Sequence, residues 1–284
     1  MRLVGVVIAV LIAVAACAVQ SSEQSEGAYV APRGPGGIHP DLNGIWQVMN
    51  EANYDLERHM ARSAMQEREG PYGPLPVPKV LYLGAVGSVP PGVGVVEGGK
   101  IPYTDEALAI KQENQQNWLQ RDPEVKCYLP GVPRATYIPQ PFQIFQGDDK
   151  VFIAYQYAGA VRDIYMEDPG PAPIDTWMGW SAGRWEGDTL VVEVTGLSEQ
   201  SWLDRSGNHH SAQMKVTERY TRIGPDHIQY EATIEDPETF TRPWKISMPL
   251  YRRMEDNAKL MDFRCVEFVE ELMYGEWRKE PLER

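Results

Sequence analysis

A carboxylate lies on the expected apolar face of a strand. In segment 214–223, Glu218 alternates in phase with Val216 and Tyr220, so the three side chains share one face. An unpaired carboxylate is costly in apolar surroundings, and burial raises the pKa of a carboxyl group towards the range useful for a base. Glu218 is therefore the candidate general base. The alternative is a buried ion pair or hydrogen-bond anchor, because structural ion pairs perturb carboxylates equally well.

The densest group of reactive side chains is segment 202–210, with the sequence Trp-Leu-Asp-Arg-Ser-Gly-Asn-His-His. We expect this loop to join two strands and to lie across a barrel mouth. His210 beside Asp204 or Glu218 would form an acid and base pair near neutral pH, with His210 as the proton shuttle. The alternative is an exposed hairpin tip with solvated histidines, because loops are surface features by default.

Nucleophilic and metal chemistry are weakly indicated. Neither Ser206 nor Ser211 lies in the Gly-x-Ser-x-Gly turn that exposes a serine nucleophile. His209 and His210 can share a metal ion only in a loop, because neighbouring side chains of a strand point to opposite faces. The sequence has no His-Glu-x-x-His or His-x-His spacing, so we predict no metal site.

Two adjacent charges, Arg162 and Asp163, fall in another expected strand, so one of them must face inward. An inward Arg162 or Arg134 offers a forked donor for a carboxylate or enolate oxygen, or a partner for Glu218. We favour pairing over the donor role. Tyr230 and Arg134 are the candidate oxyanion donors.

Aromatic residues are plentiful, with 8 Trp and 14 Tyr. Several fall in or near the expected barrel, where stacking would suit a flat or hydrophobic ligand. The candidate ligand-binding residues are Trp180, Tyr220, Trp244, Asp163 and Arg162. The alternative is core packing, with surface clusters at Trp185 and Trp202.

The elements that must position these side chains are mostly strands. Short alternating runs are expected at 142–146, 151–157, 161–166, 180–186, 189–196, 214–223, 227–235, 243–251 and 259–268. Tight turns between several of them predict a mainly β fold, an antiparallel meander that closes into a barrel and so removes its edges. Helices are expected at 51–67 and 104–120, separated by a Pro- and Gly-rich loop at 71–100.

The first residues are typical of an export signal. Arg2 precedes an apolar run, and Val14-Ala15-Ala16-Cys17 forms a lipobox, so residues 1–17 are expected to be a signal peptide with lipidation at Cys17. An ordinary cleaved signal of a soluble secreted protein is the alternative. Residues 18–39 suit a flexible tether, 40–125 a first strand with an irregular, partly helical arm, and 126–284 the barrel with a short tail.

Charge and compartment restrict the partners. The chain has 27 basic and 40 acidic residues and a net charge of −13, which argues against nucleic acid and anionic lipid. Membrane contact is expected only through the lipid anchor. A periplasmic or outer-membrane location offers no ready supply of nucleotides, so we expect no cofactor.

Apart from Cys17, the chain contains Cys127 and Cys265. An even pair in an oxidising compartment predicts a disulfide. Two buried thiols or a metal site are the alternatives, but neither cysteine has a CxxC partner or a histidine at ligand spacing.

The segment Asn43-Gly44-Ile45-Trp46, the long meander and Arg264 in the last expected strand resemble the Gly-x-Trp pattern of lipocalin-type (calycin) barrels. In that family the Trp packs across the barrel floor against a basic side chain of the final strand. The resemblance implies a closed barrel with Trp46 and Arg264 as this pair. The irregular insert between residues 50 and 130 departs from the family pattern.

A second resemblance spans roughly residues 40–268 and implies no mechanism. Four segments resemble a large group of exported bacterial proteins of uncharacterised function, namely 127–134, 183–192 (Gly-Arg-Trp-Glu-Gly-Asp-Thr-Leu-Val-Val), 202–204 and 217–220.

Together these features predict an exported small-molecule enzyme with cofactor-independent acid and base chemistry, a lyase, isomerase or hydrolase acting on a hydrophobic or aromatic compound in a barrel pocket. The competing hypothesis is a periplasmic or outer-membrane lipoprotein that carries a hydrophobic ligand unchanged. A partner module of an envelope assembly, using the arm at 50–130, is a third.

Overall fold

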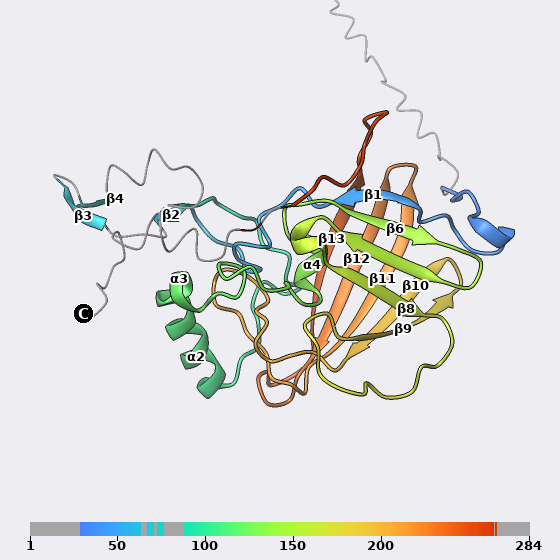
Figure 1. The fold of residues 1–284 in the computed structure, drawn as a ribbon. Coiled ribbons are helices and arrows are strands. Elements are labelled where there is room, and N and C mark those ends of the chain that lie inside the picture. The colour runs from blue at the N-terminus through green and yellow to red at the C-terminus, as the bar shows by residue number, and fades with distance from the viewer. Residues whose placement is uncertain (1–28, 64–66, 71–72, 77–87, 264, 266–284) are drawn as a thin grey trace, which may run out of the picture.

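The computed structural model describes residues 29–63, 67–70, 73–76, 88–263 and 265 (Figure 1). The predicted signal peptide and Cys17 lie outside these residues. The chain enters the fold through a 3-10 turn, η1 (Pro35–Gly37). Residues next to it are bound to the barrel, since Arg33 pairs with Asp188 at 2.5 Å and the ring of His39 stacks on Trp185 at 4.5 Å.

Nine strands form a closed β-barrel, which confirms the predicted mainly β fold and is consistent with a lipocalin-like barrel (Figure 1). They are β1 (Gly44–Gln47), β6 (Phe142–Gln146), β7 (Val151–Tyr155), β8 (Val161–Tyr165), β9 (Trp180–Glu186), β10 (Thr189–Thr195), β11 (Lys215–Gly224), β12 (His227–Glu235) and β13 (Trp244–Arg252). From β6 to β13 neighbours in the sequence are neighbours in the barrel, and β1 closes the gap between β13 and β6.

One pair of neighbours departs from the expected antiparallel meander. Strands β8 and β9 are parallel, with Ile164 opposite Ser181 and Tyr165 opposite Ala182. Parallel neighbours need a connection that returns along the barrel instead of a tight turn. The segment 166–179 makes this return.

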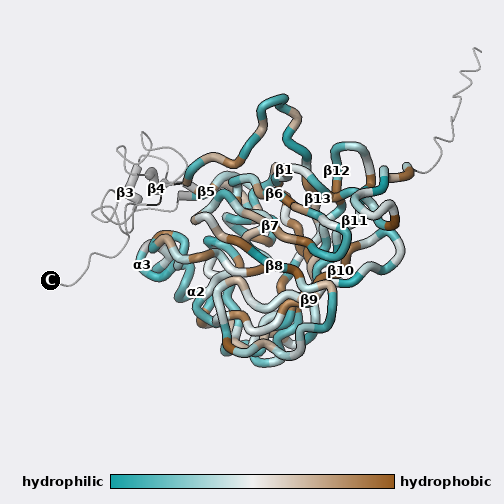
Figure 2. The backbone as a smooth tube through the Cα atoms, turned by 45° about the vertical axis from the view of Figure 1, so that its right-hand side comes forward, coloured by the Kyte–Doolittle hydropathy of each residue, from teal (hydrophilic) through white to brown (hydrophobic). Residues whose placement is uncertain are grey.

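Alternation sets which side chains fill the barrel. In β12 every second residue is buried, as in the run Ile228, Tyr230, Ala232, Ile234, and the same alternation holds for 216–220 in β11 and 244–250 in β13. Figure 2 shows hydrophobic residues recurring along the barrel strands, whereas hydrophilic residues dominate α2 (Asp105–Gln116) and α3 (Trp118–Arg121) outside it. Within the described residues, no helix combines the length and apolar character that crossing a membrane requires.

The Gly-x-Trp motif lies at the barrel floor, but its basic partner is not the expected one. The guanidinium of Arg252 lies 4.4 Å from the ring centroid of Trp46, and Arg252 also donates to the carbonyl of Asn43. Arg264 lies outside the described residues. The strand predicted at 259–268 is wrong for its described residues, 259–263 and 265, which have no strand structure. Among the described residues β13 is the last strand.

The arm before the barrel is less regular than predicted. The helix expected at 51–67 is wrong, because residues 51–63 form turns and the short strand β2 (Arg62–Ser63), which pairs with β5 (Ser88–Val89). A second short pair joins β3 (Glu67–Gly70) and β4 (Gly73–Pro76). The helix expected at 104–120 is divided into α2 and α3, and Thr104 caps α2 by accepting from the N–H of Ala107.

Two short helical segments complete the described fold. The turn η3 (Tyr157–Gly159) joins β7 to β8, and α4 (Arg134–Tyr137) precedes β6. The hydroxyl of Tyr137 donates to the carbonyl of Leu203 at 2.7 Å. This bond attaches α4 to the loop 196–214, which joins β10 to β11 at one end of the barrel.

Candidate functional site

Glu218 lies inside the barrel with each carboxylate oxygen occupied. Oε2 accepts from Nη2 of Arg162, and Oε1 accepts from the hydroxyls of Tyr220 at 3.0 Å and Tyr230 at 2.8 Å. The Nε of Arg162 donates to Oγ of Ser181 at 2.7 Å. All five side chains are buried, so the barrel encloses a connected polar cluster in an otherwise apolar interior.

Strand register explains why these residues meet. Tyr220 and Tyr230 are direct partners across β11 and β12, with ring centroids 5.1 Å apart. Glu218 precedes Tyr220 by two residues and therefore shares its inner face. Arg162 comes from β8 across the barrel, and the prediction that either Arg162 or Arg134 would pair with Glu218 holds for Arg162.

Burial and the Glu218 carboxylate determine the protonation states of the three side chains that donate hydrogen bonds to it. Burial and the nearby Glu218 carboxylate raise the pKa of Tyr220 and Tyr230 well above the usual tyrosine value, so both remain neutral O–H donors. Burial acts to lower the pKa of Arg162, but the attraction of Glu218 outweighs it and the pKa lies well above the usual arginine value. Arg162 therefore remains charged.

The hydroxyl of Thr136 borders this cluster. Oγ1 of Thr136, from α4, is buried and has no hydrogen-bond partner among the described residues. It lies close enough to the hydroxyls of Tyr155 and Tyr220 to influence their pKa. Tyr155 in turn accepts a long 3.5 Å bond from Nη1 of Arg162. The interaction of Thr136 with each of the two tyrosine hydroxyls acts to lower the pKa of that tyrosine, against the larger effect of burial.

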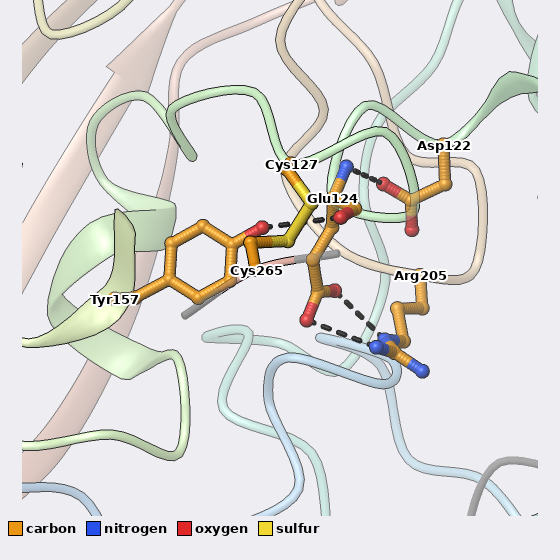
Figure 3. The surroundings of a disulfide bond; sticks show 6 residues. All are labelled: Asp122, Glu124, Cys127, Tyr157, Arg205 and Cys265. Atoms are coloured by element: carbon orange, nitrogen blue, oxygen red, sulfur yellow. Dashed lines mark hydrogen bonds and ion pairs between the residues drawn. A yellow bond between two sulfur atoms is a disulfide. The ribbon is translucent and has the colours of Figure 1, made fainter. Parts of the chain in front are cut away.

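Arg134, predicted as an oxyanion donor, is engaged elsewhere. Its guanidinium donates to Asp122 at 3.0 and 3.2 Å, to Glu124 at 2.6 Å and to Asn53 at 2.9 Å. Arg205 also binds Glu124, at 2.7 and 3.0 Å (Figure 3). The two arginines outweigh the effect of burial and lower the pKa of Glu124 to about 2. This cluster joins the arm to α4, and it engages all three guanidinium nitrogens of Arg134 away from the barrel cluster.

The same region contains the disulfide. Cys127 and Cys265 are bonded, as predicted (Figure 3). Tyr157 lies beside the bond and donates to the carbonyl of Glu124 at 3.1 Å. The disulfide therefore fixes the chain beyond β13 to the segment that leads into α4.

Asp204 does not orient His210, which corrects the predicted acid and base pair. Its carboxylate accepts from the N–H of Leu56 and of Ser206, both at 2.8 Å, and from Nδ2 of Asn208 at 2.5 Å. Burial, together with the nearby charge of Asp55, raises the pKa of Asp204 to about 7. Asp204 thus holds the arm against the loop 196–214, and this contact explains why residues 51–63 do not form a helix.

His210 is bonded to a serine that the sequence reasoning missed. Its Nε2 lies 2.7 Å from Oγ of Ser201, and its Nδ1 lies 2.8 Å from the carbonyl oxygen of Ser211. The loop is not an exposed tip, because Ser201 and His210 are 1% and 3% exposed. The folded loop explains the pairing: Trp202 and His209 form an antiparallel bridge, and the next pair outward in such a hairpin is 201 with 210.

The remaining predicted ligand-binding residues lie apart from the cluster. Asp163 is exposed on the outer face of β8, because Arg162 takes the inward position. Trp180 is half-buried outside the barrel, where its ring contacts that of Tyr165 in a tilted arrangement with centroids 4.6 Å apart. Trp244 is buried at the start of β13 against Phe240, and within the described chain its Nε1 has no hydrogen-bond partner.

The described residues contain no group of three or more His, Cys, Asp or Glu side chains arranged to hold a metal ion. Comparisons of the chain with protein-family models, curated proteins and solved structures found no match.

Proposed function

We propose that the protein is an exported small-molecule enzyme that uses acid and base chemistry without a nucleotide cofactor, of the isomerase or lyase type, on a hydrophobic or aromatic carbonyl compound. The observation that carries this proposal is the cluster of Glu218, Arg162, Tyr220 and Tyr230 inside the barrel. Stability alone does not explain why the interior holds these charges, because a buried ion pair is often no more stabilising than apolar residues of the same volume.

The chemistry follows from the types of donor and acceptor. A substrate C–H bond next to a carbonyl breaks, its proton goes to Oε1 of Glu218, and its electron pair becomes an enolate. The hydroxyls of Tyr220 and Tyr230, no longer needed by a charged Oε1, rotate to the enolate oxygen, and Arg162 balances its charge. Glu218 then returns the proton to another carbon, or a leaving group departs from the neighbouring carbon. The hydroxyl of Thr136, beside those of Tyr155 and Tyr220, orients the substrate.

The test is hydrogen exchange in heavy water with a panel of hydrophobic and aromatic carbonyl compounds. The wild-type protein should introduce deuterium next to the carbonyl, measured by small-molecule mass spectrometry. Glu218→Gln should abolish exchange and turnover while ligand affinity stays within about an order of magnitude, because the amide keeps the shape but takes no proton.

Glu218→Gln leaves Arg162 buried without its counter-ion, at a cost of about 3–5 kcal/mol, and loss of activity could then result from unfolding. A second variant with a smaller effect on stability is therefore needed. Tyr230→Phe removes one donor and no charge, and it should lower kcat by about 100-fold or more. The matched control is Glu193→Gln, because Glu193 is an exposed strand glutamate paired with Arg184 at 2.6 Å. Exchange that survives in Glu218→Gln would reject the role of the base.

The same experiment separates the enzyme from a carrier. A compound that binds saturably and is recovered without deuterium or any other change in mass would replace the enzyme proposal with that of a lipocalin-like carrier.

Export remains part of the proposal. The Cys127–Cys265 disulfide supports it, because disulfides persist in oxidising compartments such as the periplasm. Lipidation at Cys17 predicts a mature protein whose first residue carries acyl chains, which intact-mass measurement of the membrane fraction tests. A mature mass without acyl chains would favour the cleaved, soluble form.

A further inference from the structure

We propose that Ser201 is a nucleophile activated by His210, and that the pair hydrolyses esters of hydrophobic or aromatic carboxylic acids. This site uses none of the residues of the barrel cluster, so the inference does not rest on the function proposed above.

The hydrogen bonds determine which nitrogen of His210 is the base. A carbonyl oxygen only accepts, so the 2.8 Å contact with Ser211 requires the proton on Nδ1. The lone pair of Nε2 then faces Oγ of Ser201 at 2.7 Å, and the serine donates to it. A nucleophile, a base within hydrogen-bond reach, and a third group that orients the base form the arrangement typical of an activated serine.

Asp236 is the positioning residue of this arrangement. Its carboxylate accepts from the N–H of Ser211 at 2.6 Å and from the Ser211 hydroxyl at 2.8 Å. It thereby fixes the carbonyl that orients His210, and it places a negative charge near the imidazolium that forms during the reaction. Burial lowers the pKa of His210 to about 4, so the ring is a neutral base near pH 7.

The surroundings of Ser201 suit an acyl group. Gly131 has φ +74°, and a Cβ there would lie 2.7 Å from Oγ of Ser201, so glycine allows the backbone to approach the hydroxyl. Among the described residues the N–H of Gly131 has no acceptor, which leaves it available to an oxyanion. The Trp177 carbonyl lies 3.2 Å from the same Cβ position, and the Trp177 ring stacks on half-exposed Tyr128 at 5.0 Å. The segments that carry this aromatic pair therefore pass beside Ser201, which is why we choose hydrophobic and aromatic acyl groups as the substrate class.

The reaction balances within the pair. The Ser201 proton moves to Nε2 of His210 while Oγ bonds to the ester carbonyl carbon. The bond from that carbon to the alcohol oxygen then breaks, and the alcohol takes the proton from His210. Water attacks the acyl-serine in the second half, giving its proton to His210, which returns it to Ser201.

A fluorophosphonate tests this site, because it bonds to an activated serine with loss of fluoride. We expect peptide mass spectrometry of the treated full chain to locate the phosphonyl group on Ser201. Ser201→Ala should lose the label and the hydrolysis of p-nitrophenyl butyrate, and His210→Gln should slow labelling at least 100-fold, as expected for loss of a general base. Ser198→Ala is the matched control, because it keeps the backbone carbonyl that lies 3.2 Å from Oγ of Ser201.

The pH profile distinguishes catalysis from a structural hydrogen bond. Labelling should rise with pH through about 4, where His210 loses its proton, and should then level off. Labelling of Ser201 is measured independently of deuterium exchange in the barrel, so the failure of either proposal is distinguishable from failure of the other. A wild-type chain that stays unlabelled, a label on another residue, or ester hydrolysis that persists in Ser201→Ala would overturn it.

Discussion

At the scale of single residues, the fold buries several carboxylates where water cannot screen them, and three of these are compensated differently. Glu218 is balanced by one cation and two hydroxyls, whereas Glu124 is balanced by two cations. Asp204 relies on neutral N–H donors and carries a raised pKa. At Glu218 the two tyrosine hydroxyls are neutral donors that can rotate towards a ligand. The ion pairs at Glu124 offer no such donor, so we expect chemistry at Glu218 and a structural role for Glu124.

His210 makes stability depend on pH. Its pKa is about 4 in the folded protein and near 6.5 in the unfolded chain, so the unfolded chain binds more protons between these values. The stabilisation is complete above pH 6.5 and is lost as pH falls towards 4, at up to about 1.4 kcal/mol per pH unit. Urea unfolding of the wild-type protein and of His210→Gln at pH 7, 6 and 5 measures this contribution of His210 to the free energy of unfolding.

The comparison with the variant isolates His210, because the neighbouring His209 and Asp236 titrate in both proteins. The difference in unfolding free energy between wild type and His210→Gln should shrink as pH falls. A difference that stays constant from pH 7 to pH 5 would contradict the lowered pKa.

At the scale of elements, the docking of α2 depends on one glycine in the loop 196–214. Gly207 has φ +85°, and a Cβ there would lie 2.7 Å from the Gln115 nitrogen and 2.8 Å from the Lys111 carbonyl oxygen. The Gly207 carbonyl also accepts from Asn114 at 3.4 Å. The helix therefore lies directly against the backbone of the loop.

Gly207→Ala should separate α2 from the loop, because the side chain meets helix backbone that cannot move aside cheaply. Gly187→Ala is the control, since Gly187 has φ +60° with nothing within 4 Å of a Cβ. This variant should lose only about 1–2 kcal/mol of stability, which is the cost of the left-handed backbone for alanine. Urea unfolding and hydrogen exchange in 105–116 should show the larger loss in Gly207→Ala. Equal losses would mean that the close approach is not needed.

Much of the barrel could be predicted from period-2 alternation and turn residues, because both act within a few residues of sequence. The same alternation placed Glu218 inside.

The alternation could not decide whether Arg162 or Asp163 faces inward, since that choice depends on a strand across the barrel. The residues after 50 were predicted as a helix because their tertiary partner, Asp204, lies 148 residues beyond Leu56. His210 was assigned to the wrong partner because Ser201 becomes its neighbour only once the loop folds back.

At the scale of the whole molecule, the disulfide joins residues 138 positions apart, so it encloses most of the described barrel. A cross-link over a loop of this length restricts the unfolded chain by about 4–5 kcal/mol on the chain-entropy model. The double variant Cys127→Ser with Cys265→Ser should lose stability of this order while keeping the far-ultraviolet spectrum of the barrel.

The reduced wild-type protein is the control for that variant, because reduction removes the disulfide and keeps both cysteine side chains. Urea unfolding of both should give similar losses. An unchanged free energy of unfolding would mean that the ion pairs around Glu124 already hold the two segments together.

The parallel pair β8 and β9 is connected with the odd number of strands in the barrel. Strand direction reverses at every antiparallel neighbour, and a closed ring must return to its starting direction, so an all-antiparallel ring needs an even number of strands. Nine strands close only with an odd number of parallel seams, and this barrel has one. The return segment 166–179, which brings Trp177 beside Gly131, is therefore required by the strand count. A variant of this fold with one strand more or fewer could not keep both a closed ring and a single parallel seam.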